Sequence, residues 1–317
     1  MKATVFDAKR GDVQVELGEL AHRLATESFC WLDLDGASAE ELQTVTAMLH
    51  IAEPARSWLP RFGQRARFEV DGQQIRISTF AADVSGVPIE EHILYTQSWL
   101  LTVHAGATTT MERARNMYRV FTAKIASNHA AGLLMVLSEC IASFDPWLEQ
   151  ADALLGALED QVLRAPKAAQ LQQLSGLRKQ LGALHRLWAP QQAAIRNFVV
   201  AIGGLPEIRE KAQLVRDYEE RISDLLDRIN DLRQRATEAM ESYATSVSNT
   251  QSQVMNRLTI ISAVFLPMTF LTGYLGMNMQ WMVDHITSLA AYLVLGVGAF
   301  VAMVATTLLL FKRRGWL

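Results

Sequence analysis

The sequence predicts an α+β domain, then a very long helix, then two C-terminal transmembrane helices. Three observations carry this prediction. Short strand patterns mixed with helical ones fill residues 1 to about 110. No Gly or Pro occurs between Pro206 and Pro267, so nothing in that stretch stops a helix. No Lys, Arg or Glu occurs from Leu258 to Phe311, and this apolar window can cross a bilayer twice at about 20 residues per crossing.

Composition sets outer limits on the function. A chain of 317 residues can hold one large or two ordinary domains. Its net charge of -3 gives no reason to expect a nucleic-acid partner. Cys30 and Cys140 stand alone without a CxxC motif, which favours two small core residues in a reducing compartment over a disulfide. The start MKATVFDAKRGD has no apolar core, so we expect no signal peptide.

The first domain begins with patterns typical of strands and one capped helix. The segment SFCWLDLDG alternates between apolar and polar residues and predicts a strand. The helix that follows has Ser38 as its N-cap and Glu41 at the capping-box position. Residues 67–80 predict a hairpin around Asp71-Gly72, and residues 92–106 predict two more strands.

From Thr110 onward the pattern is almost entirely helical. Pro146, Pro166, Pro190 and the run GGLP at 203–206 are expected to break it.

Nothing in this first domain predicts catalysis. Its histidines lack HxxxH or HExxH spacing, and neither a GxSxG motif nor a P-loop is present. Glu90, Glu91 and His92 could be offered as a metal site, but adjacent residues rarely converge on one ion, which favours a solvated loop. His104 is expected at a strand end, with its ring bonded to backbone. We therefore expect a protein that is not an enzyme.

The long helix is expected to start after Pro206, which suits a first helical turn, and to continue from Glu207 into the first membrane span. Such a helix would measure on the order of 100 Å. Its apolar residues follow an a/d heptad, which requires neighbouring helices. These residues are Val215, Tyr218, Ile222, Leu225, Ile229, Leu232, Ala236 and Ala239.

The acids of this helix allow two interpretations. Asp217, Asp224 and Asp231 each precede an arginine by four residues, which predicts a solvated face of intrahelical ion pairs. Asp227 has no base three or four residues away, and Asp224 and Asp231 flank it on the same surface. Because such carboxylates repel one another unless a cation is bound, Asp224, Asp227 and Asp231 form a hypothetical regulatory site for a divalent metal.

Towards and within the first span, one helix face changes character. Apart from Met255 and Leu266, its members are an acid, hydroxyl residues or Gly: Glu241, Thr245, Ser248, Ser252, Met255, Thr259, Ser262, Leu266, Thr269 and Gly273. We call these ten residues the polar stripe. Small and hydroxyl residues also line dry contacts between membrane helices, but the extension of the stripe down to Glu241 favours the lining of a water-filled path. Pro267 is expected to kink or loosen the span.

Charge sets the expected topology. All basic residues lie at or before Arg257 or in the tail at 312–314, which places both chain termini in the cytoplasm and the loop 279–285 outside. The expected divisions are a cytoplasmic α/β domain with a helical second half at 1–205, a stalk helix at 206–257, a pore-lining span at 258–275, an outer loop at 276–285, a second span at 286–311 and a basic tail at 312–317.

Asn278 lies just past the outer end of the polar stripe, after Gly276, which can end the helix and let backbone approach closely. If several copies of the chain surround one axis, their Asn278 side chains form a ring of carbonyl oxygens at the outer mouth. Such a ring suits Mg2+, which holds its first water shell tightly, because the amides can accept hydrogen bonds from the bound waters.

The segment TIISAVFLPMTFLTGYLGMNM, with the preceding SNTQSQVMNRLT, the long acidic helix, two terminal spans and a basic tail, resembles the CorA family of divalent-cation channels, which includes ZntB-like and CmaX-like members. The resemblance implies a homopentameric funnel in the bacterial inner membrane, with divalent ions, lipid and further copies of the chain as partners and no prosthetic group. It implies that Gly276, Met277 and Asn278 form the selectivity filter. It also implies that Ser252, Met255, Leu258, Leu266, Thr269 and Gly273 line or constrict the path.

The chain departs from the usual pattern of the family in three places. The outer loop MQWMVDH lacks the acidic residue often found shortly after the motif, for which Asp284 is the candidate substitute. The aromatic residue that usually precedes the Gly is Leu275, and Ser252 stands where Asn is common. Mg2+ remains the expected ion, with Zn2+ or broad divalent transport as the alternative. A non-conducting scaffold or regulator anchored in the membrane is the second alternative, although an anchor has no use for hydroxyl residues in register with Glu241.

Overall fold

The structure is a computed structural model that describes residues 2–7, 11–14, 29–63, 67–71, 74–106, 109–121, 125, 128–202, 209–277, 280, 285 and 288–313. The chain divides into two compact units, Met1–Met240 and Glu241–Leu317, which are described separately below.

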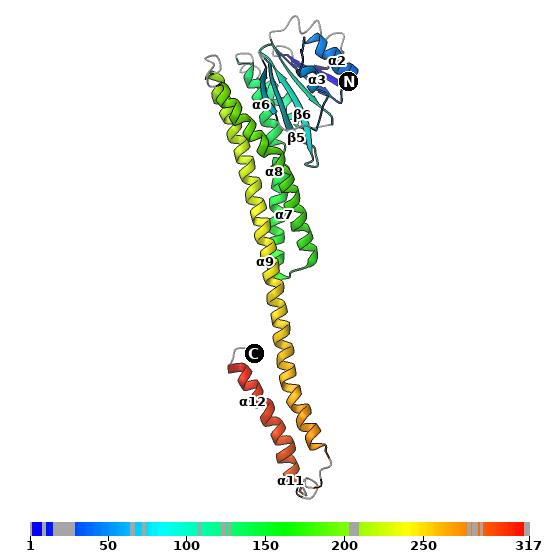
Figure 1. Cartoon of the computed structure of the whole chain (residues 1–317), viewed down its shortest axis with the longest axis vertical. Coiled ribbons are helices and arrows are strands. Elements are labelled where there is room, and N and C mark those ends of the chain that lie inside the picture. Colours follow the sequence, from blue (N-terminus) through cyan, green and yellow to red (C-terminus); the bar gives the residue numbers. More distant parts are fainter. Residues whose placement is uncertain are drawn as a thin grey trace. The chain divides into compact units, whose positions relative to one another are not determined.

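The first unit is built on a sheet that has seven strands among the described residues, in the order β2-β1-β3-β7-β6-β5-β4 (Figure 1). The β3–β7 pair is parallel and the other pairs are antiparallel. The strands are β1 Lys2–Asp7, β2 Gly11–Gln14, β3 Cys30–Asp35, β4 Arg67–Asp71, β5 Gln74–Ala82, β6 Pro88–Tyr95 and β7 Trp99–His104.

The predicted strands and hairpin are confirmed. β3 lies inside the segment that alternates, and β4 pairs with β5 so that Asp71 stands opposite Gln74. Gly72 itself lies outside the described residues. The parallel register of β3 with β7 sends Leu32 and Leu34 to one face of the sheet and Trp31 and Asp33 to the other.

The solvated loop expected at 90–92 is wrong, because these residues lie in β6. His92 has no exposed surface, and its ring stacks on Trp58 and Phe62 with centroids 4.2 and 4.6 Å apart. Its Nδ1 donates to the carbonyl of Leu59 at 2.9 Å. Both faces of this strand are covered, so the alternation of apolar and polar residues that marks a half-exposed strand is absent.

Helices α2, Ala39–Met48, and α3, Ala55–Trp58, cover one face of the sheet. The predicted capping box is present: the Ser38 hydroxyl accepts from the Glu41 amide at 3.2 Å, and the Glu41 carboxylate accepts from the Ser38 amide at 2.8 Å. Leu42 and Val45 then pack against Leu32 of the sheet in one buried cluster. Cys30 belongs to this cluster and is buried like Cys140, and the two do not form a disulfide, as predicted.

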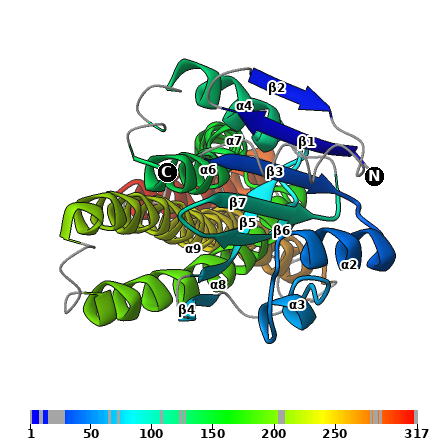
Figure 2. The ribbon, with the colours of Figure 1, turned by 90° about the horizontal axis from the view of Figure 1, so that it is seen from above.

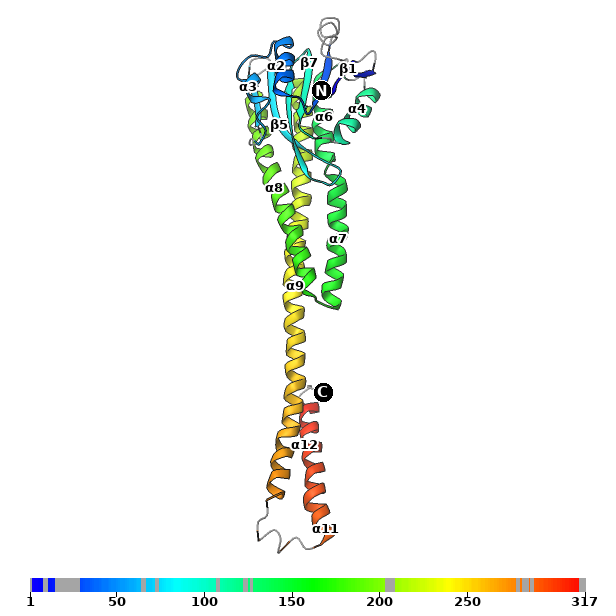
Figure 3. The same cartoon turned by 90° about the vertical axis from the view of Figure 1, so that its right-hand side faces the viewer.

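The other face is covered by longer helices (Figure 2). They are α4 Thr109–Val120, α6 Ala130–Ala142, α8 Ala168–Ile202 and the first part of α9 Arg209–Leu275. Helix α7 Asp145–Arg164 packs on α8 and runs on past the end of the sheet (Figure 3). Tyr118 of α4 packs on Trp31 with ring centroids 5.8 Å apart. The Gln191 amide of α8 donates to the Ser78 carbonyl of β5 at 3.1 Å.

One predicted helix break is wrong. Pro146 lies in the first turn of α7, and Pro166 separates α7 from α8, as expected. Pro190 instead lies inside α8. Trp188 and Gln191 on either side of it have no exposed surface, so tertiary packing offsets the roughly 3 kcal/mol that an internal proline costs a helix.

The predicted apolar seam of α9 is confirmed, since all its members except the partly buried Val215 are buried. The predicted intrahelical ion pairs at Arg228 and Arg235 are wrong. Arg228 donates to Asp145 of α7 at 2.6 Å, and Arg235 donates to Asp152 at 2.6 Å and to Glu159 at 3.0 Å. Helix α7 packs along α9 and places these carboxylates beside the arginines. A pairing between two helices cannot be seen from the residue spacing within one of them.

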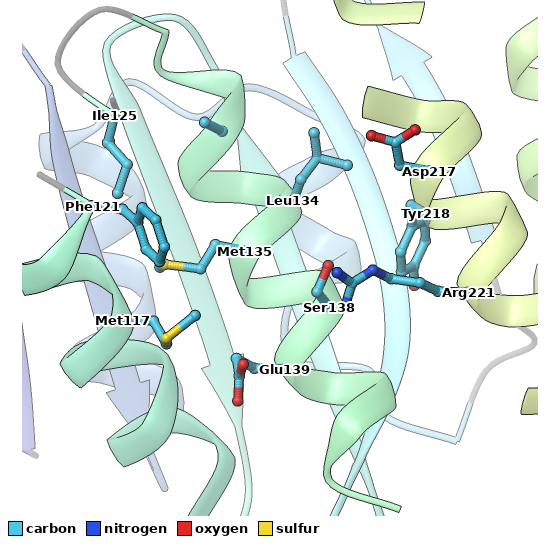
Figure 4. Close-up of a pocket in the computed structure, with 11 residues that line it drawn as sticks. Met117, Phe121, Ile125, Leu134, Met135, Ser138, Glu139, Asp217, Tyr218 and Arg221 are labelled. Carbon is cyan, nitrogen blue, oxygen red and sulfur yellow. The ribbon is translucent and has the colours of Figure 1, made fainter. Parts of the chain in front are cut away.

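A hollow of about 260 Å³ lies where α4, α6 and α9 meet (Figure 4). Met117, Phe121 and Met135 give it an apolar wall, and Asp217 and Arg221 lie on the α9 side. Methionine side chains are flexible and fill irregular gaps. We therefore attribute this hollow to irregular packing between the helices and assign it no ligand.

Gly86 holds the turn between β5 and β6 at a position that no other residue fits. Its φ is +79°, and a Cβ there would lie 2.3 Å from Cδ1 of Trp147. We expect Gly86→Ala to lower the free energy of unfolding of this unit by about 2 kcal/mol or more, because left-handed strain adds to the clash. Chemical denaturation followed by tryptophan fluorescence measures the loss. Gly156→Ala, which meets no atom within 4 Å, is the control and should cost nothing. Equal stability of the Gly86 variant and wild type would contradict the expectation.

The second unit contains the end of α9, then α11 Leu289–Tyr292, a π-helical segment Leu293–Gly298 and α12 Ala299–Arg313. Among the described residues, three helical segments are long and apolar enough to cross a membrane. The window within Ala130–Arg164 is 44% buried inside the first unit, where it covers the sheet. The windows within Val215–Tyr274 and Gly296–Arg313 contain no buried residue. Of the three, only these last two therefore have an apolar window in which no described residue is fully buried by the rest of the chain.

Candidate functional site

The polar stripe lies on one uninterrupted helix. α9 continues through Pro267 to Leu275, and every member of the stripe from Glu241 to Gly273 is exposed. Leu258, which the family resemblance adds, is also exposed. The stripe follows the three-and-four spacing of a single helix face, so these groups lie above one another along it.

A different face of the same helix is covered by α12, which runs beside the end of α9 (Figures 1 and 3). The partly covered residues of α9 are Ile260, Ala263, Val264, Pro267, Met268 and Leu271. Those of α12 also recur at helical spacing: Ala299, Phe300, Met303, Val304, Thr307 and Phe311. Partly buried residues that recur at helical spacing on both helices are expected where two helices pack side by side. Because α12 packs on the apolar strip, it leaves the polar stripe free for water, lipid or another copy of the chain.

The hydroxyl hydrogens of the threonines in the stripe are already hydrogen-bonded within the helix. Thr245, Thr259 and Thr269 donate to the carbonyls four residues earlier at 2.9 to 3.0 Å. With the O–H directed into the helix, the remaining lone pairs of each hydroxyl face outward as acceptors. A face of hydroxyl oxygens attracts cations or the hydrogens of their bound water, and the sequence pattern alone did not show this orientation.

The helix ends where the sequence predicted. Leu275 is its last residue, and the Gly276 amide donates to the Thr272 carbonyl at 2.9 Å. A Cβ on Gly276 would lie 3.0 Å from that carbonyl oxygen, so the predicted close approach of backbone is present. Met277 is exposed, with its amide on the Tyr274 carbonyl at 3.3 Å. Asn278 and most of the outer loop lie outside the described residues.

Asp224, Asp227 and Asp231 are all exposed on α9. Asp227 and Asp231 line a hollow beside α7 together with Glu149, Asp152 and the arginines Arg228 and Arg235, whereas Asp224 does not. Among the described residues of one chain, no three acidic, His or Cys side chains are close enough to hold a metal. The regulatory metal site stays a prediction.

A buried charged cluster lies between the sheet and α4, and sequence reasoning missed it. Asp33 accepts from the Thr102 hydroxyl at 2.5 Å and from Arg115 at 2.8 Å, and its Oδ1 lies 3.4 Å from Nε2 of His104. The expected backbone bond of His104 at the end of β7 is confirmed, since its Nδ1 donates to the Gly106 carbonyl at 2.8 Å. The signal was available in the polar residues that alternate with apolar ones, Asp33 and Asp35 in β3 and Thr102 and His104 in β7.

Opposite charges and burial shift the pKa values of this cluster. Burial alone would lower the pKa of His104, but Asp33 and Glu91 raise it to about 9. Burial raises the pKa of Glu91 to about 8, and neither of its carboxylate oxygens has a hydrogen-bond partner. Burial acts to raise the pKa of Asp33 too, but hydrogen bonds and charge from His104, Thr102 and Arg115 lower it overall.

These shifts predict that the first unit loses stability as the pH rises. Both raised pKa values mean that the folded state binds protons more tightly than the unfolded state. The associated stability is present at low pH and is lost from about pH 4.5 to 8 for Glu91 and from about pH 6.5 to 9 for His104. We expect the free energy of unfolding to fall by about 1.4 kcal/mol per pH unit for each group within its window.

Denaturation midpoints measured from pH 6 to 9 test this expectation. Glu91→Gln should flatten the profile, because the amide cannot ionise, while Glu112→Gln on the exposed side of α4 should follow wild type. A Glu91→Gln profile as steep as that of wild type would contradict the assignment.

Comparison with known proteins agrees with this architecture. The family model described as CorA-like Mg2+ transporter protein matches residues 26–313. The cobalt/magnesium transport protein CorA of Thermotoga maritima is 27% identical over 170 residues, which cover 54% of this chain and about half, 48%, of that protein. The putative metal ion transporter YfjQ of Bacillus subtilis is 22% identical over 290 residues, covering 90% of this chain and 89% of the relative.

Solved structures share the fold. The complete CorA magnesium transporter of Methanocaldococcus jannaschii superposes with a TM-score of 0.80 at 19% identity, covering 100% of this chain and 99% of that one. Full-length CmaX gives a TM-score of 0.73 at 17% identity, covering 99% and 97%. The sheet, the long α9 and the C-terminal helices are thus a known combination, and the family model spans nearly all of it. The chain belongs to the CorA-like Mg2+ transporter family.

Proposed function

We propose that the protein is a divalent metal cation channel or transporter of the inner membrane, with Mg2+ as its principal ion, both termini in the cytoplasm and a homopentameric funnel. The observation that carries this proposal is the polar stripe. It is continuous and exposed on α9, it is left uncovered by α12, and it ends at the turn that precedes Asn278. A helix that served only as an anchor would gain nothing from this arrangement in lipid.

In the proposed assembly the stripes of several copies surround a water-filled axis. Glu241 lies at the inner end, where a ring of carboxylates concentrates cations. The hydroxyl acceptors of Thr245, Thr259 and Thr269 then offer hydrogen-bond partners to the water shell of the ion. Exposed Met255, Leu258 and Leu266 form apolar constrictions along the same path.

Gly276, Met277 and Asn278 form the proposed selectivity filter. Gly276 permits the sharp end of α9, and Asn278 supplies an amide oxygen from each copy. Neutral acceptors favour an ion that keeps its water, as Mg2+ does. The first unit is the proposed regulator, and a metal bound near Asp224, Asp227 and Asp231 is the proposed signal for it.

Ion flux into liposomes tests the function. Purified protein in liposomes loaded with a fluorescent divalent indicator should admit Mg2+ at a rate well above that of protein-free liposomes. A parallel measurement with Zn2+ decides between Mg2+ and the zinc-transporting alternative, since the faster ion identifies the cargo. Rates equal to those of protein-free liposomes for both ions, with the protein correctly inserted, would favour the scaffold alternative instead.

A further inference from the structure

The two helices that pack beside α9 in the first unit carry charge of opposite sign. α7 contains five acids, Asp145, Glu149, Asp152, Glu159 and Asp160. α8 contains no acid over its whole length from Ala168 to Ile202. Three of the α7 acids are paired with arginines of α9, as described above. On α8, Arg196 is paired with Glu219 of α9, but Arg178, Lys179 and Arg186 form no ion pair with a described carboxylate.

These cations border a groove of about 600 Å³ between α8 and α9, which we call the basic groove. From α8 it is lined by Arg178, Lys179, Gly182 and Arg186, and from α9 by Asn230, Arg233, Gln234 and Thr237. Within the described parts of the chain, none of its four cations forms an ion pair with a carboxylate. The lining contains no acid and no aromatic residue.

Two guanidinium groups converge at the middle of the groove. A Cβ on buried Gly182 would lie 3.6 Å from an Nη of Arg186 and 4.0 Å from Nε of Arg233. That Nε is buried and has no hydrogen-bond partner among the described residues, and the Nη1 of Arg233 donates to the Asn230 side-chain oxygen at 3.3 Å. Bringing two like charges together at a glycine costs free energy unless an anion lies between them.

The positive charges of Arg186 and Arg233 also affect the neighbouring His185. Burial and the charges of Arg233 and Arg186 lower the pKa of His185, so this imidazole is kept neutral beside the groove. An unbalanced positive field of this kind is the electrostatic condition for anion binding.

We propose that the basic groove binds a polyphosphate anion, either inorganic polyphosphate or the phosphate chain of a nucleotide. Arg178 and Arg186 are eight residues apart on one helix face, which spaces them about 12 Å along the axis, longer than a single phosphate. Guanidinium groups match phosphate oxygens with paired hydrogen bonds, and the amide nitrogen of Asn230, whose oxygen accepts from Arg233, adds a donor. With no aromatic side chain to stack on a base, recognition is of the phosphate chain alone. This inference is independent of the ion path.

Isothermal titration calorimetry on the full-length protein in detergent tests the proposal. The buffer contains EDTA, so that metals bound at acidic sites do not contribute. We expect inorganic triphosphate, ATP and GTP to bind with similar Kd values, about ten-fold or more tighter than AMP or orthophosphate, and to weaken as salt rises. Arg233→Gln and Arg186→Gln should each weaken triphosphate by about ten-fold. Arg196→Gln, on the same helix but paired with Glu219 at 2.8 Å, should leave it unchanged.

The variants must also retain the fold, so each is checked by its melting temperature, and the exposed Arg178→Gln serves as a second variant of the groove. Tight binding of ATP but not of triphosphate would overturn recognition of the phosphate chain. Absence of triphosphate binding to the wild-type protein would overturn the proposal. If Arg186→Gln and Arg233→Gln also lost the oligomer, the groove would be assigned to carboxylates of a second copy of the chain.

Discussion

Asn278→Ala is expected to lower Mg2+ flux into liposomes by at least about ten-fold. In the proposed assembly every copy loses its amide oxygen at the same ring, and a loss of only ~1.4 kcal/mol in the binding of the hydrated ion produces that factor. Alanine removes the acceptor and leaves the short helix end at Gly276 intact, because that turn is held by backbone hydrogen bonds. The effect should therefore fall on conduction and selectivity, with assembly unchanged.

Gln280→Ala is the matched control for this change. Gln280 is an exposed amide two residues further along the chain and lies past the proposed filter. Flux should survive its removal. The assignment of the filter fails if the two variants conduct Mg2+ equally well, or if Asn278→Ala transports Mg2+ as fast as wild type while both proteins assemble normally.

Local patterns predicted the parts of the molecule that depend on neighbours in sequence. The capping box of Ser38 and Glu41, the hairpin of β4 and β5 and the end of α9 at Gly276 each follow from a few adjacent residues. The apolar seam of α9 was also predictable, because a heptad pattern shows which face of a helix is buried. The pattern does not identify the helices that bury it.

The errors arose where distant parts of the chain meet. Pro190 stays helical because Gln191 is bonded to the sheet and Trp188 packs on Phe144. Arg228 turns to α7 because Asp145 lies there. Glu91 and His104 stand opposite each other on paired strands only once β6 and β7 are in register. None of these contacts is encoded by spacing within one element, so single-sequence reasoning could not place them.

Cysteine accessibility along the polar stripe gives the most direct test of the proposed path. Ser262 and its neighbour Ile261 are both exposed in the single chain, with Ile261 at 53%, but they lie about 100° apart around the helix. If the stripe borders water and the adjacent face borders lipid, only the first position can be reached from solution. The native thiols give little background, because Cys30 and Cys140 are buried and burial raises the pKa of Cys140.

We therefore expect Ser262→Cys to react with a positively charged methanethiosulfonate under conducting conditions and to lose Mg2+ flux by about ten-fold or more, since a fixed cation in the path repels the next one. Ser248→Cys and Thr269→Cys should behave alike, because they share the face. Ile261→Cys should neither react nor lose flux. Should Ser262→Cys stay unmodified while flux continues, or Ile261→Cys react as readily, water would not follow the stripe. The hydroxyl oxygens would then be contacts between helices, as membrane helices also use them.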